Sequence, residues 1–71
     1  MNRFLEVDTA KLRRLRRLAA LSQQELAERA GTTQETVSRL ERGHHHARGS
    51  TLRRLADELG VEPRELMEGE G

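Results

Sequence analysis

Four polar side chains on one short segment have the types and spacing that recognition of DNA bases requires: Gln34, Glu35, Ser38 and Arg39. An amide can form two hydrogen bonds to adenine and a guanidinium two to guanine, and each such pair contributes roughly 1–3 kcal/mol of discrimination. Glu35 fits less well, because phosphates repel a carboxylate. It could accept a hydrogen bond from cytosine or pair with Arg39 one helical turn later, and we favour the second use. The alternative is a polar helix face that contacts only water.

Polar residues around this segment could contact the DNA backbone. Thr33 and Thr36 can offer methyl groups to thymine or hydroxyl groups to phosphate, and four further candidates are cationic or become so on protonation: Arg42, His44, His45 and Arg48. Imidazoles donate hydrogen bonds to phosphates and gain charge below a pKa of about 6.5. Three adjacent histidines on one loop, residues 44–46, rarely converge on one ion, so we expect neither a metal site nor any other cofactor.

A helix-turn-helix would hold these side chains in place. Counting Gln23 as the first position, Ala27 is fifth, Gly31 is ninth, Val37 is fifteenth and Leu40 is eighteenth. This spacing is typical of two helices joined by a tight turn, of which the second enters the DNA major groove. A small residue, here Ala27, is needed where the two helices cross. Val37 and Leu40, the apolar residues of the second helix, must face inward. The polar face of that helix therefore points outward.

Helical periodicity extends over nearly the whole chain, and no stretch alternates as a strand does. We expect five helices: from Asp8 or Thr9 to about Ala20, from Ser22 to Gly31, from Thr33 to about Arg42, from about Ser50 to Leu59, and from Pro63 through Met67. Serine, threonine and aspartate suit helix starts, and glycine suits helix ends. The prediction is an all-α, compact five-helix fold without a sheet, in which residues 44–49 form a loop.

We expect one domain over residues 9–68, between an N-terminal arm at 1–8 and a frayed end at 69–71. The first helix should turn its inner stripe, which includes Ala19, toward the core. Leu18 is apolar on the outer side of this helix. The arm most simply folds back onto the first helix and forms a small apolar patch with Leu18, although a subunit contact is the other use of that leucine.

Composition excludes several classes of protein. The 71-residue chain has no cysteine, so no disulfide or thiolate zinc site can stabilise it. No apolar run approaches the ~20 residues of a membrane span and no export signal is apparent, so we expect a cytoplasmic protein without membrane contact. Ten basic and six acidic residues give positions 1–48 a net charge of +4, whereas three basic and six acidic residues give positions 49–71 a net charge of −3. A basic front suits binding to a polyanion. No catalytic arrangement of residues appears, so we do not expect an enzyme.

The stretch from Leu12 to Met67 resembles the phage repressor and Cro type of helix-turn-helix domain, also called the xenobiotic-response-element family. The matching segments are Leu12-x-x-Leu15-Arg16, Leu21-Ser22-Gln23-x-Glu25-Leu26-Ala27, Ala30-Gly31, Val37-Ser38-Arg39-Leu40-Glu41-Arg42-Gly43 and Leu55-Ala56-x-x-Leu59-Gly60-Val61. The resemblance covers about four-fifths of the chain. It implies a lambda-repressor-like domain of five helices that binds double-stranded DNA, usually as a homodimer on inverted repeats.

The same resemblance implies roles for three further residues. Gln23 stands where family members contact phosphate, helped by the amides at a helix N-terminus. Arg16 and Glu41 match a structural ion pair between the first helix and the end of the third. The implied function is sequence-specific transcription regulation, most simply by a small repressor whose subunits meet through the loop around Arg48 and the turn at 61–67. The alternative is an antitoxin that binds a toxin, or an adaptor for another protein.

Overall fold

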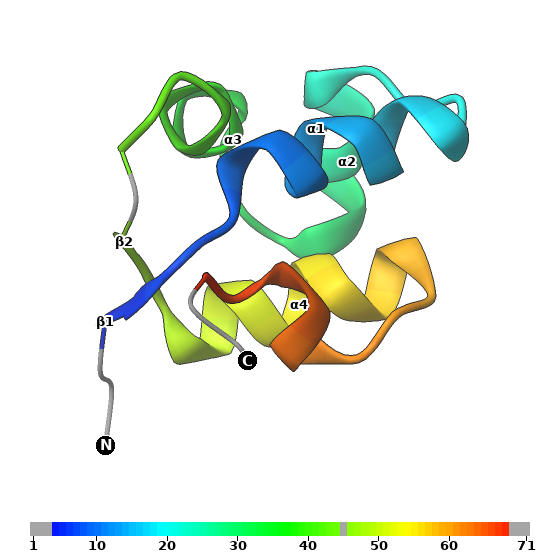
Figure 1. Cartoon of the computed structure of the whole chain (residues 1–71). Coiled ribbons are helices and arrows are strands. Elements are labelled where there is room, and N and C mark those ends of the chain that lie inside the picture. The colour runs from blue at the N-terminus through cyan, green and yellow to red at the C-terminus, as the bar shows by residue number, and fades with distance from the viewer. Residues whose placement is uncertain (1–3, 45, 69–71) are drawn as a thin grey trace.

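Helices make up most of the chain, and two short strands join its N-terminal part to the segment before the last α-helix. The structure is a computed structural model that describes residues 4–44 and 46–68. In chain order its elements are β1 (Phe4–Glu6), α1 (Thr9–Leu18), α2 (Gln23–Ala30), α3 (Gln34–Glu41), β2 (His46–Arg48), α4 (Gly49–Leu59) and the 3-10 helix η1 (Pro63–Leu66) (Figure 1). Within the described ranges, no helix is both long enough and apolar enough to cross a membrane.

The first three α-helices begin at the side chains that the sequence indicated. Asp8 caps α1, Ser22 caps α2 and Thr33 caps α3, because each side-chain oxygen accepts a hydrogen bond from a backbone amide of the first turn. Gly31 ends α2 with a φ of 70°, in the left-handed region that glycine adopts without strain. These caps fix where the two helices of the motif start and where the turn between them lies.

The C-terminal end of α1 differs from the prediction. The helix ends at Leu18 rather than at about Ala20, and Ala19 is exposed instead of facing inward. Ala20 has a φ of 59°, so the backbone turns there into a left-handed conformation. This turn brings Leu21 into the core, where its side chain is buried. The inner stripe of α1 therefore stops before Ala19.

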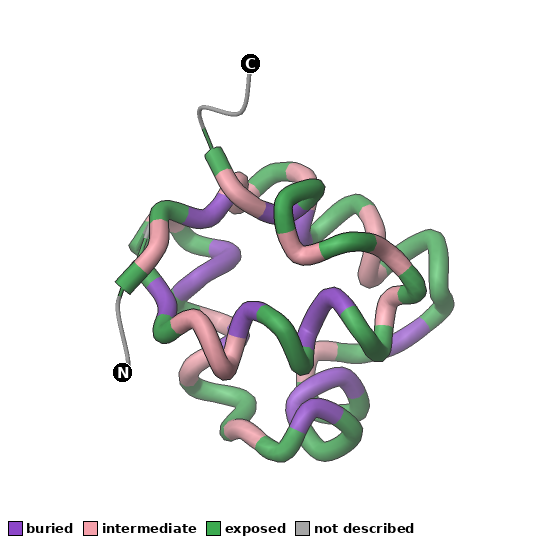
Figure 2. The backbone as a smooth tube through the Cα atoms, turned by 90° about the horizontal axis from the view of Figure 1, so that it is seen from below, coloured by how far each residue is buried: buried purple, intermediate pink, exposed green. Residues whose placement is uncertain are grey.

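The core lies among the four α-helices and takes in residues from both ends of the described chain. Its largest fully buried side chains are Leu12, Leu26, Leu52, Leu55, Leu66, Val7 and Val37. Figure 2 shows how the buried positions are distributed along the backbone. Ala27 is also buried, in α2, which packs against α3 and α4. Because protein interiors are close-packed, a larger side chain at Ala27 would push these helices apart.

The prediction of a fold without a sheet is wrong. β1 and β2 pair in antiparallel orientation, with Leu5 opposite Ala47. Ala47 is buried and Leu5 packs against the core, whereas the residues on either side of them are exposed. Each strand is three residues long, so its alternation is too short to be distinguished from helical periodicity. The predicted loop at 44–49 therefore contains a strand.

The N-terminal segment does not fold back onto α1, because it pairs with β2 and with the C-terminal part of the chain. Asp8 N donates a hydrogen bond to Leu66 O at 2.8 Å. Val7 is fully buried and forms an isolated β-bridge with Met67. Leu18 is left 73% exposed. The segment predicted as an arm is thus part of the folded core, and the apolar patch expected at Leu18 is not formed.

The fifth predicted helix is the short 3-10 helix η1, so the described residues contain four α-helices and one 3-10 helix. Leu66 anchors η1 in the core. Met67 is extended, because its backbone pairs with Val7 instead of continuing the helix. Residues 69–71, which we expected to fray, lie outside the described residues.

Candidate nucleic-acid interface

The recognition helix α3 presents a polar face on the side opposite its buried anchors, Val37 and Leu40. The four predicted base-reading residues lie on this face, fully or partly exposed: Gln34, Glu35, Ser38 and Arg39. In the described part of the chain, Glu35 and Arg39 form no ion pair within 4.0 Å. The pairing that we favoured for Glu35 is therefore absent, and both side chains are free to face a ligand.

Behind α3, an ion pair connects its last residue to α1. Arg16 Nε donates to Glu41 Oε2 at 2.7 Å and Arg16 Nη2 donates to Glu41 Oε1 at 2.9 Å, so the guanidinium and the carboxylate meet through two parallel hydrogen bonds. Arg16 Nη1 also donates to the carbonyl oxygen of Leu21 at 2.9 Å. The side chains of Arg16 and Glu41 are only 12% and 2% exposed. The pair implied by the resemblance is present, and it ties α3 to α1 and to the turn before α2.

Gln23 is the third member of this cluster, although the sequence placed it among the phosphate contacts. Its amide Nε2 donates to Glu41 Oε1 at 3.1 Å, and its side chain is half-buried. Gln23 is also the first residue of α2, where backbone amides and the helix dipole favour an anion. Sequence reasoning missed the contact with Glu41, because no local pattern connects two residues that are 18 positions apart.

The cluster shifts the titration of both charged groups. Burial alone would raise the pKa of Glu41, but hydrogen bonds from Arg16 and Gln23 and the positive charges of Arg16 and Arg13 hold that pKa below its ordinary value of 4.5. The hydrogen bond with Glu41 raises the pKa of Arg16 above its ordinary value. Both groups are therefore charged at neutral pH, and attraction between their charges adds to the hydrogen bonds.

Thr33 and Thr36 bond to each other at the start of α3. The Thr33 hydroxyl accepts from Thr36 N at 3.1 Å and donates to the Thr36 hydroxyl at 2.9 Å. Part of the hydrogen-bonding capacity of both hydroxyls is thus used within the protein. A contact with DNA would use the methyl groups or the remaining capacity of each hydroxyl.

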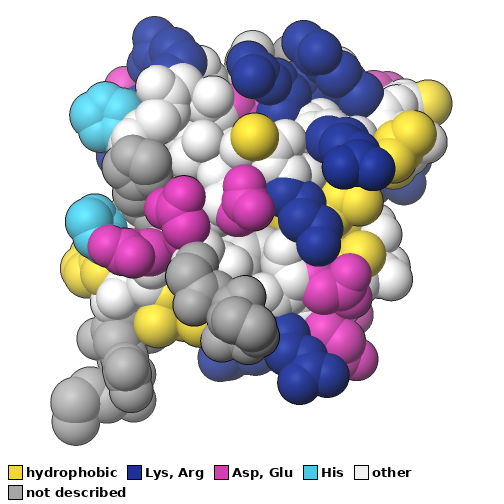
Figure 3. All heavy atoms as spheres, in the orientation of Figure 1, with side chains coloured by type: hydrophobic (Ala, Val, Ile, Leu, Met, Phe, Trp, Pro, Cys, Tyr) yellow, Lys and Arg dark blue, Asp and Glu magenta, His cyan; other side chains and the backbone are white. Residues whose placement is uncertain are grey.

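Cationic side chains continue beyond the end of α3. Arg42, His44 and Arg48 are exposed, whereas His45 lies outside the described residues. On the face drawn in Figure 3, Lys and Arg side chains line much of the upper edge, and others lie in the right half of the view and at the lower edge. A surface of this sign suits contact with phosphates. No group of three or more His, Cys, Asp or Glu residues within 4–44 and 46–68 could hold a metal ion.

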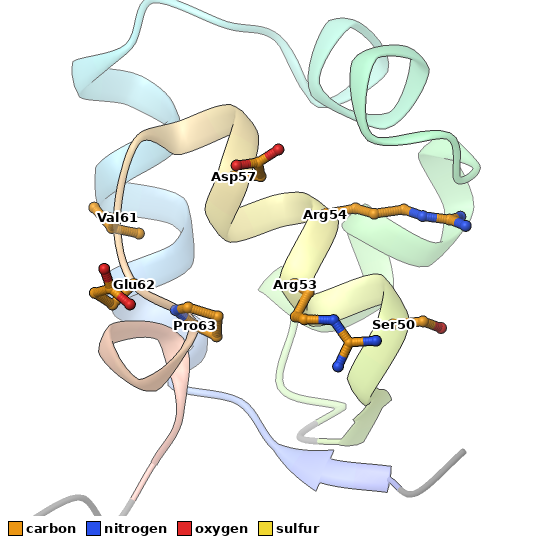
Figure 4. Close-up of a pocket in the computed structure, with 7 residues that line it drawn as sticks. All are labelled: Ser50, Arg53, Arg54, Asp57, Val61, Glu62 and Pro63. Carbon is orange, nitrogen blue, oxygen red and sulfur yellow. The ribbon is translucent and has the colours of Figure 1, made fainter. Parts of the chain in front are cut away.

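Two hollows of the surface differ in how they lie relative to α3. One, of about 270 Å³, lies between α3 and the β1–β2 ribbon and is lined by residues that include Phe4, Thr36, Arg39, His46 and Arg48. The other, of about 460 Å³, lies beside α4 and the turn that follows it, and its lining includes Arg53, Arg54, Asp57 and Glu62 (Figure 4). The second hollow has mixed charges and contains none of the predicted DNA-contacting residues. Only the first hollow belongs to the candidate interface.

Comparison with known proteins decides the family. A family model described as helix-turn-helix matches residues 12–66. The chain belongs to this helix-turn-helix family. An uncharacterised HTH-type transcriptional regulator of Sinorhizobium fredii is 44% identical over 54 residues, which span 76% of this chain and 70% of that protein. Members of the family are DNA-binding transcription regulators rather than enzymes.

Solved structures of three regulators or their complexes share the fold. The restriction-modification controller protein C.AhdI from Aeromonas hydrophila is 37% identical with a TM-score of 0.77, over 83% of this chain and 86% of its own. The P22 c2 repressor, solved with a synthetic operator, is 23% identical with a TM-score of 0.82, over 92% of this chain and 98% of its own. A chain of the SinR–SinI protein complex is 24% identical with a TM-score of 0.80, and the match covers 86% of this chain and 60% of that one. Because their identities are below 25%, the similarities to the P22 c2 repressor and to the SinR–SinI chain show only that the fold is shared.

Proposed function

We propose that this helix-turn-helix protein represses transcription by occupying an inverted-repeat operator as a homodimer, which excludes polymerase from the DNA. In this proposal α3 lies in the major groove, where Gln34 and Arg39 read bases while Glu35 and Ser38 add contacts to base edges. The observation that carries it is the exposed polar face of α3, supported from behind by buried apolar anchors and by the Arg16–Glu41 pair.

A second group of residues would position the protein without reading sequence. Backbone contacts fix register and orientation, and only base contacts specify the site. We assign this positioning role to residues at the start of α2, around α3 and in the segment after it: Gln23, Thr33, Thr36, Arg42, His44, His45 and Arg48. Because cations at phosphates release counterions, affinity should fall steeply as salt concentration rises.

Dimerisation follows from the small number of base pairs that one recognition helix can read. A two-fold pair doubles the sequence that is read, and its half-sites lie about 10 base pairs apart, which is one turn of DNA. We place the subunit contact at the outer side of the turn at 61–67 and leave the Arg48 side chain to the DNA backbone. The C.AhdI similarity supports a regulator of this general kind, since that protein is a restriction-modification controller.

Binding-site selection from random duplex DNA tests the proposal. The selected sites should contain an inverted repeat with the expected half-site spacing, and native mass spectrometry should find two protein chains on each selected duplex. Footprinting at saturation should protect both half-sites. Protection of one unpaired half-site, or one chain per duplex, would contradict the dimeric part of the proposal. Recovery of no consensus at all would contradict sequence-specific binding.

A further inference from the structure

The β1–β2 ribbon carries an exposed pair of side chains, of which the proposed function uses only Arg48, as a contact to the DNA backbone. Phe4 stands opposite Arg48 across the two strands, and the Arg48 guanidinium carbon lies 5.9 Å from the centre of the Phe4 ring. This distance is within the range of a cation–π interaction. Phe4 is the only aromatic residue in the chain, and 63% of it is exposed. An exposed ring held by a cation is an unusual use of a residue that normally contributes to a core.

The strand geometry explains why the ring is held outside the core. Leu5 and its partner Ala47 face inward, so the alternation of side chains turns Phe4 and Arg48 to the other side of the ribbon. The burial of Ala47 and the packing of Leu5 fix this register. The pair is therefore presented to solvent by a ribbon whose opposite face packs against the core.

The exposed pair borders the recognition helix. Phe4 and Arg48 line the hollow of about 270 Å³ together with Thr36 and Arg39 of α3 and His46 of β2. Among the described residues no carboxylate lines this hollow, and its other lining residues are Thr32, Ala47 and Thr51. The nearby carboxylate of Glu6 lies outside the lining, with Oε2 at 4.0 Å from His46 Nε2. Guanidinium, imidazole and hydroxyl groups are donors to phosphate oxygens. An apolar ring beside them suits the carbon face of a sugar.

We propose that Phe4 and Arg48 form a sugar–phosphate clamp beside α3, in which Arg48 donates to a DNA backbone phosphate and the Phe4 ring packs on the adjoining deoxyribose. The clamp rests on the proposed function, because the DNA must lie along α3. Its new elements are the aromatic contact and the strand β1, which place a residue outside the helix-turn-helix in contact with DNA. The contact is independent of sequence, since it involves no base.

The two members of the clamp should leave different signatures. Arg48→Ala removes a phosphate contact, so the slope of log affinity against log salt should decrease in magnitude by about one. Phe4→Ala removes an uncharged contact, so that slope should stay unchanged while affinity falls about fivefold. Phe4→Tyr keeps the ring and should bind like the unaltered protein. The loss caused by Phe4→Ala should be smaller in an Arg48→Ala background, because the ring and the cation act together.

Fluorescence anisotropy of the full chain, with a selected operator duplex and a shuffled duplex over a range of salt concentrations, measures all of these effects. Leu18→Ala is the matched control, because it removes another exposed apolar side chain, on α1. Thermal melts of each variant separate loss of binding from loss of folding. We expect Phe4→Ala to weaken both duplexes alike, with a melting temperature close to that of the unaltered protein.

Three results would overturn the clamp. One is that Phe4→Ala binds both duplexes as tightly as Leu18→Ala does. Another is that Phe4→Tyr loses as much affinity as Phe4→Ala, because an aromatic ring at position 4 would then not preserve binding. The third is that thymidine monophosphate binds at the hollow without competing with duplex DNA, which would make the site one for a free phosphorylated molecule. If the unaltered protein binds neither duplex, the proposed function fails; if it binds both and Phe4 has no effect, only the clamp fails.

Discussion

At the scale of single residues, the cluster of Arg16, Glu41 and Gln23 determines how α3 is held. The carboxylate accepts hydrogen bonds from both partners, and it lies on the last residue of the recognition helix. Buried ion pairs are weak evidence of stability, because desolvation offsets much of the attraction. The same pairs are costly to break, since removal of one partner leaves the other charge buried without compensation. We therefore expect this cluster to orient α3 more than it stabilises the fold.

Substitutions at the pair test this role. Glu41→Gln keeps the shape of the side chain but removes its charge, so the free energy of unfolding should fall by about 3 kcal/mol. Arg16→Met should cost less in combination with Glu41→Leu than it does alone, because two apolar residues need no counter-charge. Urea melts of the single and double variants give the coupling energy. The control is Arg53→Met at an exposed position of α4, where we expect a change within about 0.5 kcal/mol. Strict additivity would show that Arg16 and Glu41 do not interact.

The depressed pKa of Glu41 predicts a specific dependence of stability on pH. A carboxyl group whose pKa is lower in the folded than in the unfolded state contributes stability above its unfolded value, here about 4.5. That contribution is lost as pH falls from there through the folded-state pKa, because the unfolded chain takes up the proton first. The difference in unfolding free energy between the unaltered protein and Glu41→Gln should therefore shrink as pH is lowered from 7 to 3. A constant difference over this range would contradict the assignment.

At the scale of elements, the sequence could predict the helices but not the strands. The capping residues Asp8, Ser22 and Thr33 mark helix starts by short-range chemistry, so they could be read from the chain. β1 and β2 are held by pairing between residues about 40 positions apart, and three-residue strands carry too little alternation to be seen. The outward face of α3 follows from Val37 and Leu40, whereas the contact between Gln23 and Glu41 depends on tertiary structure. Pairing of Arg16 with Glu41 came from the family resemblance alone.

Val7 provides the clearest test of the role of the N-terminal segment in the fold. Its side chain is fully buried, so Val7→Ala should lower the free energy of unfolding by about 2 kcal/mol. Leu18→Ala, at a residue that is 73% exposed, should change it by less than about 0.5 kcal/mol. Chemical denaturation of both variants measures the contrast. Equal effects would mean that Val7 does not contribute to the core, as expected if residues 1–8 were an arm outside the domain.

At the scale of the whole molecule, the residues that hold the fold together and the residues proposed to contact DNA lie in different places. The N-terminal segment lies between β2 and the residues after η1, and these pairings join the two ends of the described chain to the core. α3 and the cationic residues after it lie on the surface, where few intramolecular bonds involve their side chains. Residues 1–48, which have a net charge of +4, supply most of this surface. Membership of the family was predictable from motif spacing.

The recognition helix α3 is proposed to read the DNA sequence, and selection of binding sites by three variants tests this proposal. Gln34→Ala and Arg39→Ala should each relax the base preference at particular positions of the selected consensus, because each removes a contact to a base edge. Gln23→Ala should weaken binding to all sequences alike and leave the consensus unchanged. If the consensus of both α3 variants is the same as that of the unaltered protein, α3 does not read the sequence and the account is wrong.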